Sequence, residues 1–106
     1  MKSVKILILR LSSIGDIVLS SAFIRQVAGT FPNSEIDFVI KSQYAELVQY
    51  NPYLNTIYPV ESNKGFHHLL KIREILKSNN YDYIFDLHNN FRTRILLTGL
   101  FIVILM

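Results

Sequence analysis

Residues 4–16 read Val-Lys-Ile-Leu-Ile-Leu-Arg-Leu-Ser-Ser-Ile-Gly-Asp, and this stretch decides the fold. Residues 4–9 are aliphatic except for Lys5, and this run, which ends at Arg10, is typical of a parallel strand that is covered on both faces. From Asp16 to Ala28 apolar residues recur at helical spacing, and residues 29–32, which include a glycine and a proline, end that pattern. The stretch therefore predicts a turn from a buried strand into the first helix of an α/β domain.

The rest of the chain continues the alternation of strands and helices. We expect further strands at residues 36–40, 56–60 and 83–87, a short helix at 44–48 and an amphipathic helix at 66–77. Strands that alternate with helices imply a parallel, right-handed, Rossmann-like sheet with flanking helices. A length of 106 residues leaves room for one domain only.

Composition narrows the class of partner. Eleven Lys and Arg against eight Asp and Glu give a net charge of +3, spread along the chain, which is weak evidence for an anionic partner and none for nucleic acid. The chain has no cysteine and its three histidines lack zinc-like spacing, so we expect no disulfide, no metal and a cytoplasmic setting. Four scattered glycines form neither a dinucleotide nor a Walker motif, and no cofactor is expected.

The turn after the first strand is the first candidate site, because ligands gather at the carboxyl ends of parallel strands. Ser12 and Ser13 supply hydroxyls and backbone N–H groups, Gly15 permits a close approach, and Asp16 places a carboxylate where the helix begins. A sugar hydroxyl or a phosphate could be held there. The alternative is a helix cap, since Ser13 and Asp16 also fit the S-x-x-D capping box, and from spacing alone the cap is the commoner interpretation.

The turn after the last predicted strand, residues 86–94, is the second candidate site. Arg92 and Arg94 are candidates for an anionic acceptor, because guanidinium groups suit phosphates and carboxylates. His88 could be a base, a donor to substrate or polar filling at a strand end. In the alternative interpretation Asp86 and Asn90 cap turns while the arginines lie in solvent.

Four segments of the chain resemble the successive landmarks of one enzyme family. They are residues 5–25, residues 31–36 (Phe-Pro-Asn-Ser-Glu-Ile), residues 51–53 (Asn-Pro-Tyr) and residues 81–92 (Tyr-Asp-Tyr-Ile-Phe-Asp-Leu-His-Asn-Asn-Phe-Arg). In this order they resemble glycosyltransferase family 9, the ADP-heptose:lipopolysaccharide heptosyltransferases. The resemblance covers about residues 4–94.

The resemblance implies a fold, a reaction and roles for residues. Residues 1–94 would be part of the N-terminal, acceptor-binding Rossmann-like domain of a two-domain GT-B enzyme. Such enzymes transfer heptose from ADP-heptose to the lipid A and Kdo inner core, with inversion and without an obligatory metal, at the cytoplasmic face of the inner membrane. By resemblance Asp16 is the catalytic base. The acceptor-binding residues expected from this comparison and from the two turns are Ser12, Ser13, Gly15, His88, Asn90, Arg92 and Arg94.

Two departures from the family pattern set further expectations. We expect the second domain, which carries most sugar-nucleotide contacts, to be absent, and residues 95–106 to be an atypical apolar tail in place of the family's continuation. We therefore expect the chain to be inactive or poorly folded by itself. Two other readings stay open: a non-catalytic module in which Arg10, Arg92 and Arg94 hold a phosphorylated sugar or lipid headgroup, and a degenerate gene remnant.

Overall fold

The computed structural model describes residues 3–61, 63–97 and 104–105. The helices are α1 (Ile14–Thr30), the 3-10 helix η1 (Ser42–Leu47), α2 (Gly65–Ser78) and α3 (Phe91–Leu96). The strands are β1 (Val4–Leu9), β2 (Ser34–Lys41), β3 (Leu54–Val60), β4 (Tyr83–Asp86) and β5 (Ile104–Leu105).

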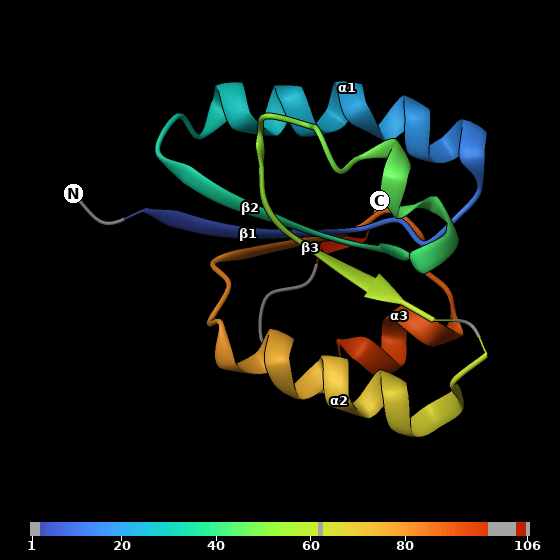
Figure 1. The fold of residues 1–106 in the computed structure, drawn as a ribbon. Coiled ribbons are helices and arrows are strands. Elements are labelled where there is room, and N and C mark those ends of the chain that lie inside the picture. The colour runs from blue at the N-terminus through green and yellow to red at the C-terminus, as the bar shows by residue number, and fades with distance from the viewer. Residues whose placement is uncertain (1–2, 62, 98–103, 106) are drawn as a thin grey trace.

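The strands form one parallel sheet in the order β3-β2-β1-β4-β5. β1 lies in the middle, paired with β2 on one side and β4 on the other, and Ile6 lies opposite both Ile36 and Tyr83. Figure 1 shows α1 on one face of the sheet and α2 with α3 on the other. The predicted α/β fold, a parallel sheet with flanking helices, is confirmed.

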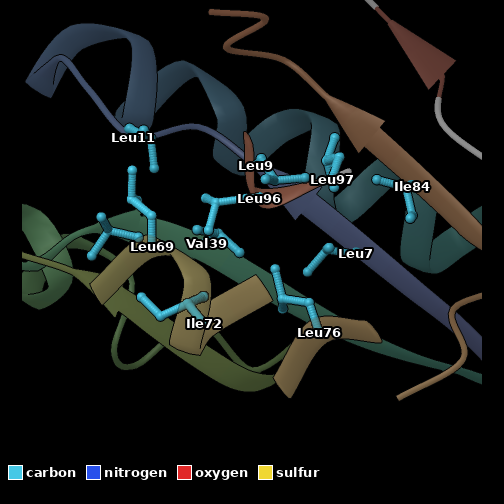
Figure 2. Close-up of a cluster of buried hydrophobic side chains, with 11 residues drawn as sticks. Leu7, Leu9, Leu11, Val39, Leu69, Ile72, Leu76, Ile84, Leu96 and Leu97 are labelled. Carbon is cyan, nitrogen blue, oxygen red and sulfur yellow. The ribbon is translucent and has the colours of Figure 1, made fainter. Parts of the chain in front are cut away.

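Alternation along β1 builds the two hydrophobic cores that cover the sheet. Ile6 and Ile8 face α1, whereas Leu7 and Leu9 face α2 and α3, and all four side chains are fully buried. Figure 2 shows the core that contains Leu7 and Leu9, in which side chains of α2 and α3 pack against those of the sheet. Each such buried aliphatic side chain contributes about 1.5–3 kcal/mol by leaving water. The apolar residues 6–9 of β1 therefore have packing partners on both faces.

Three helices differ from the sequence-based expectation. η1 is a 3-10 helix that begins two residues before the helix expected at 44–48. α1 begins at Ile14, two residues before Asp16, because the N-cap residue Ser13 is extended and ends the preceding turn. The second predicted turn is shorter than residues 86–94, because α3 starts at Phe91. Asn90 caps this helix; the alternative interpretation gives Asn90 a capping role, but for a turn and not for a helix.

The apolar tail expected from residue 95 onward is described only in part. Leu96 and Leu97, at the end of α3, are buried in the core, so α3 continues across residue 94. β5 pairs in parallel with β4. Residues 98–103 and 106 lie outside the described residues.

A buried polar cluster connects the end of α2 to the sheet. Asp37, in β2, is buried, and its Oδ2 accepts a 2.6 Å hydrogen bond from the hydroxyl of Tyr81. Asn79, the residue after α2, donates from Nδ2 to the hydroxyls of Tyr58 and Tyr81 at 3.1 and 3.3 Å. Burial, followed by the contact with Asp37, raises the pKa of Tyr81 far above its usual value. This cluster ties three segments that are distant in sequence.

Candidate functional site

The two turns that the sequence singled out lie side by side at the carboxyl edge of the sheet. β1 and β4 are neighbours, Leu9 lies opposite Asp86, and the N–H of Leu87 donates to the carbonyl of Leu9 at 3.0 Å. The Nη1 of Arg10 then donates to the carbonyl of Leu87 at 2.7 Å. The strand order thus joins the turn after β1 to the turn after β4.

Asp16 lies in the first turn of α1 and accepts two interactions on the same carboxylate oxygen. Its Oδ2 is 2.7 Å from Nη2 of Arg10 and accepts the backbone N–H of Ser13 at 3.4 Å. Ser13 and Asp16 form the predicted capping box, so the cap interpretation is confirmed. The hydrogen bond from Arg10, and next the one from Ser13, hold the pKa of Asp16 below its usual value. Asp16 is therefore a carboxylate at neutral pH, and its side chain stays 48% exposed.

An open hollow of about 240 Å³ lies beside Asp16. It combines a charged end with apolar walls, and its lining residues are Arg10, Asp16, Leu19, Ser20, Phe23 and Leu87. Close by in sequence, Gly15 is exposed, and a Cβ added to it would meet no atom within 4 Å. Packing within the protein therefore does not require the glycine, which leaves room for a ligand to approach the backbone.

The buried side chain of Asp86 holds the second turn by hydrogen bonds to its backbone. Its side chain is fully buried, and its Oδ1 accepts the backbone N–H groups of His88 at 3.1 Å and Asn89 at 2.7 Å. Asn89 has a φ of 47°, the left-handed conformation that asparagine tolerates. Asp86 therefore caps this turn, as the alternative interpretation held, while its Oδ2 and the Nδ1 of His88 are buried without a hydrogen-bond partner.

His88 comes from the second turn but lies within electrostatic reach of the first. Burial lowers the pKa of His88, the positive charges of Arg10 and Lys41 lower it further, and Asp86 together with a backbone hydrogen bond to Ser12 opposes the shift. His88 in turn slightly lowers the pKa of Asp16. A neutral imidazole therefore faces the Asp16 turn at pH 7.

The remaining predicted acceptor-binding residues have other contacts. Asn90 Oδ1 accepts the N–H of Thr93 at 3.0 Å, and Thr93 Oγ1 accepts the N–H of Asn90 at 3.0 Å, which together cap α3. Arg94 Nη2 donates to Asn89 Oδ1 at 3.0 Å. Arg92 lines a separate hollow of about 40 Å³ with residues from the β3–α2 region.

The structure thus brings some of the predicted site residues together, places others elsewhere, and gives Arg10 a larger part. The first turn, with Ser12, Ser13, Gly15 and Asp16, lies with His88 at one place. Arg10 entered the sequence analysis only as a possible anion ligand, yet it is the residue that connects the two turns. The sequence partly predicts the position of Arg10, because Arg10 follows Ile6 and Ile8 at the two-residue period of a strand and so lies on the face that α1 covers. Among the described residues, no three His, Cys, Asp or Glu side chains gather as a metal site would need.

The fold and this edge place the chain in a class: it shares its α/β fold with glycosyltransferase family 9 structures. The family 9 glycosyltransferase from Veillonella parvula DSM 2008 matches 99% of this chain and 32% of its own, with a TM-score of 0.80 and 23% identity. The E. coli heptosyltransferase WaaC, solved with ADP-2-deoxy-2-fluoro heptose, matches 95% of this chain and 35% of its own, with a TM-score of 0.74 and 20% identity.

In sequence, the particular relatives are lipopolysaccharide heptosyltransferases. Lipopolysaccharide heptosyltransferase 3 of Escherichia coli is 27% identical over 90 residues, covering 77% of this chain and 26% of the relative. The lipopolysaccharide core heptosyltransferase OpsX of Haemophilus influenzae is 26% identical over 93 residues, covering 88% of this chain and 26% of the relative. The chain is therefore a glycosyltransferase-like sequence that spans about a quarter of the length of the curated relatives it matches.

No family model matches the chain. Within the described part of the chain, no helix combines the length and the apolar character needed to cross a membrane.

Proposed function

We propose that this chain supplies the acceptor-binding half of a heptosyltransferase, the N-terminal Rossmann-like domain of a GT-B enzyme, with residues 1–94 as its working part. The complete enzyme would transfer heptose from ADP-heptose to the inner core of lipopolysaccharide at the cytoplasmic face of the inner membrane. The proposal rests on the heptosyltransferase relatives and on the arrangement around Asp16.

The carboxylate of Asp16 is the single observation that carries the proposal. It stands at the edge where strand ends meet, it is ionised at neutral pH with a pKa that Arg10 lowers further, and it borders an open hollow. Single displacement at an anomeric carbon needs a base beside the acceptor hydroxyl. In the proposed step Asp16 takes the hydroxyl proton, the acceptor oxygen bonds to the anomeric carbon, and the bonding pair leaves with the diphosphate.

The other predicted residues receive roles by resemblance to the family. Ser12, Ser13 and Gly15, in the same turn as Asp16, would contact the acceptor beside the hollow, and neutral His88 would donate or accept a hydrogen bond there. Arg92 and Arg94 would hold an anionic group of the acceptor. Arg94 would then exchange its hydrogen bond to Asn89 for one to the acceptor.

Asn90 has a supporting role in this scheme. Because its amide oxygen caps α3, Asn90 would order the second turn around the acceptor. The donor sugar nucleotide would be held mainly by the part of the relatives that this chain does not span, so we expect the chain to be inactive alone.

The test combines the purified chain with the separately expressed C-terminal half of a family 9 heptosyltransferase. ADP-heptose and a lipid A/Kdo acceptor are added, and ADP release and product mass are measured. We expect transfer in the mixture and not with the chain alone. Asp16→Asn should lower kcat by about 10²–10⁴-fold, the usual contribution of a general base. Glu35→Gln, which removes an exposed carboxylate at the opposite edge of the sheet, should leave transfer unchanged.

Each outcome has a definite reading. Transfer that survives Asp16→Asn would show that another group is the base. Acceptor binding by the chain, followed by amide shifts at residues 10–16 and 86–94, without transfer in any mixture would favour the non-catalytic module instead.

A further inference from the structure

We propose that Arg10 is a positioning residue for the base: it holds the carboxylate of Asp16 by Oδ2 and so leaves Oδ1 to take the proton of the acceptor hydroxyl. The inference rests on the proposed function, because it names the reacting oxygen of the same site. The names of the relatives do not mention a positioning role for Arg10, and the helix-capping role of Asp16 does not require one.

The guanidinium of Arg10 has two anchors that point in different directions. Nη2 contacts Asp16 Oδ2 at 2.7 Å, and Nη1 donates to the carbonyl of Leu87 at 2.7 Å. The second contact belongs to the turn after β4, so the orientation of the group is fixed from outside α1. The side chain is only 22% exposed, and its Nε is buried without a hydrogen-bond partner. A planar guanidinium that is held through both of its Nη atoms fixes the orientation of the carboxylate it contacts. A lysine ammonium, which is a single point charge, does not.

The contacts of Asp16 fall on one of its two oxygens. The salt bridge to Arg10 and the hydrogen bond from the Ser13 N–H both end on Oδ2. Within the described part of the chain no hydrogen bond engages Oδ1, and Asp16 lines the open hollow. A half-exposed carboxylate with both contacts on one oxygen has its rotation restricted, and its other oxygen remains available to a hydroxyl.

Helix capping alone does not account for this arrangement. The capping box needs only Ser13 and Asp16, whereas Arg10 adds a charge and a connection to Leu87. Arg10 acts strongly on Asp16 and favours the ionised carboxylate; His88 acts in the same direction, weakly, and only when its imidazole is protonated. Arg10 makes Asp16 a weaker base but holds its carboxylate in one orientation. Orientation matters for rate, because a misplaced catalytic group can cost about 10²-fold.

The first test needs no transfer reaction. The purified chain, labelled with ¹³C at aspartate carboxyls, is titrated by NMR to obtain the pKa of Asp16 in the wild type and in Arg10→Gln. We expect the pKa to rise in the variant. Arg25→Gln is the matched control, because it removes the same charge from an exposed position nine residues along α1, more than a Debye length of about 8–10 Å away. An unchanged Asp16 pKa in Arg10→Gln would overturn the inference.

A reciprocal measurement covers the case in which Arg10→Gln does not fold. In Asp16→Asn the Nε–H resonance of Arg10 should shift and exchange faster with water, because one of the two anchors of the guanidinium is lost. If the resonance stayed where it is in the wild type, Arg10 would not be coupled to Asp16 and the inference would be wrong.

The second test uses the complemented mixture described above. Arg10→Lys keeps the charge but not the fork, so kcat should fall about 10–100-fold while KM for the acceptor stays unchanged. In an Asp16→Asn background the same substitution should have little further effect, because Arg10 acts through Asp16. Wild-type kcat in Arg10→Lys would refute the positioning role. Absence of transfer with the wild-type chain would refute the proposed function alone, since the NMR titration still decides the effect of Arg10 on Asp16.

Discussion

The hydroxyl of Tyr81 should contribute measurably to stability, and Tyr81→Phe tests this with the loss of one oxygen atom. In the native structure this hydroxyl donates a 2.6 Å hydrogen bond to Oδ2 of Asp37, which is only 7% exposed. The other carboxylate oxygen has one weak donor, Nδ2 of Asn55 at 3.4 Å. Phenylalanine keeps the ring packing but leaves a buried carboxylate oxygen without its donor.

The expected loss follows from the kind of hydrogen bond. A bond to a charged group contributes about 1.5–3 kcal/mol, and a buried acceptor that loses its donor also keeps its desolvation cost. We therefore expect Tyr81→Phe to lower the free energy of unfolding by about 2 kcal/mol. In a domain of this size that corresponds to a fall in Tm of about 8–10 °C.

The same contact predicts a dependence on alkaline pH. The pKa of Tyr81 is raised in the folded state, mainly by burial and then by Asp37. Above about pH 10 the unfolded chain therefore releases a proton that the folded chain keeps, and the free energy of unfolding falls as pH rises. The slope difference between wild type and Tyr81→Phe should approach about 1.4 kcal/mol per pH unit.

Urea unfolding of the purified chain, followed by circular dichroism at pH 7 and from pH 9 to 11, measures both effects. Tyr50→Phe is the matched control, since Tyr50 is 88% exposed and should change stability by less than about 0.5 kcal/mol. The reasoning fails if Tyr81→Phe resembles Tyr50→Phe at pH 7, or if its alkaline slope equals that of the wild type.

Two other measurements test the core and the site. Leu76→Ala, at a fully buried position of α2, should lower the free energy of unfolding by about 2–5 kcal/mol. The neighbouring Ile75→Ala, at a position 48% exposed, should lower it much less. Equal losses would contradict the assigned helix face. In an NMR titration the pKa of His88 should lie below its usual value and rise in Arg10→Gln, because burial and Arg10 both disfavour the imidazolium. Since the unfolded chain then binds the proton more readily, His88 should reduce stability as pH falls below about 6.5, and a His88 pKa above that value would contradict this.

Much of the fold follows from short-range patterns in the sequence. The aliphatic residues of β1 favoured a strand covered on both faces, and the regular apolar spacing after Asp16 favoured a helix packed on it, and the structure has both. The cap at Ser13 was equally local, because its partners are three residues apart. The short helix α3 escaped prediction, since six residues provide too little periodicity to stand out from a polar turn.

The candidate site was predictable as two turns but not as one place. Local pattern indicates that polar residues follow β1 and β4, yet it does not indicate which strands are neighbours in the sheet. The order β3-β2-β1-β4-β5 brings Arg10 to Leu87, 77 residues away in sequence, and leaves Arg92 at a different hollow.

What the sequence by itself determined is therefore most of the longer elements and the cap at Ser13, because hydrophobic period and capping depend on residues within one or two turns of each other. Only the tertiary structure decided which groups meet. It brought the buried Asp37 into hydrogen-bond contact with Tyr81, 44 residues away, and placed the guanidinium of Arg10 against one oxygen of Asp16. Such contacts depend on strand order and on how helices cover the sheet, which long-range packing sets and no local period records.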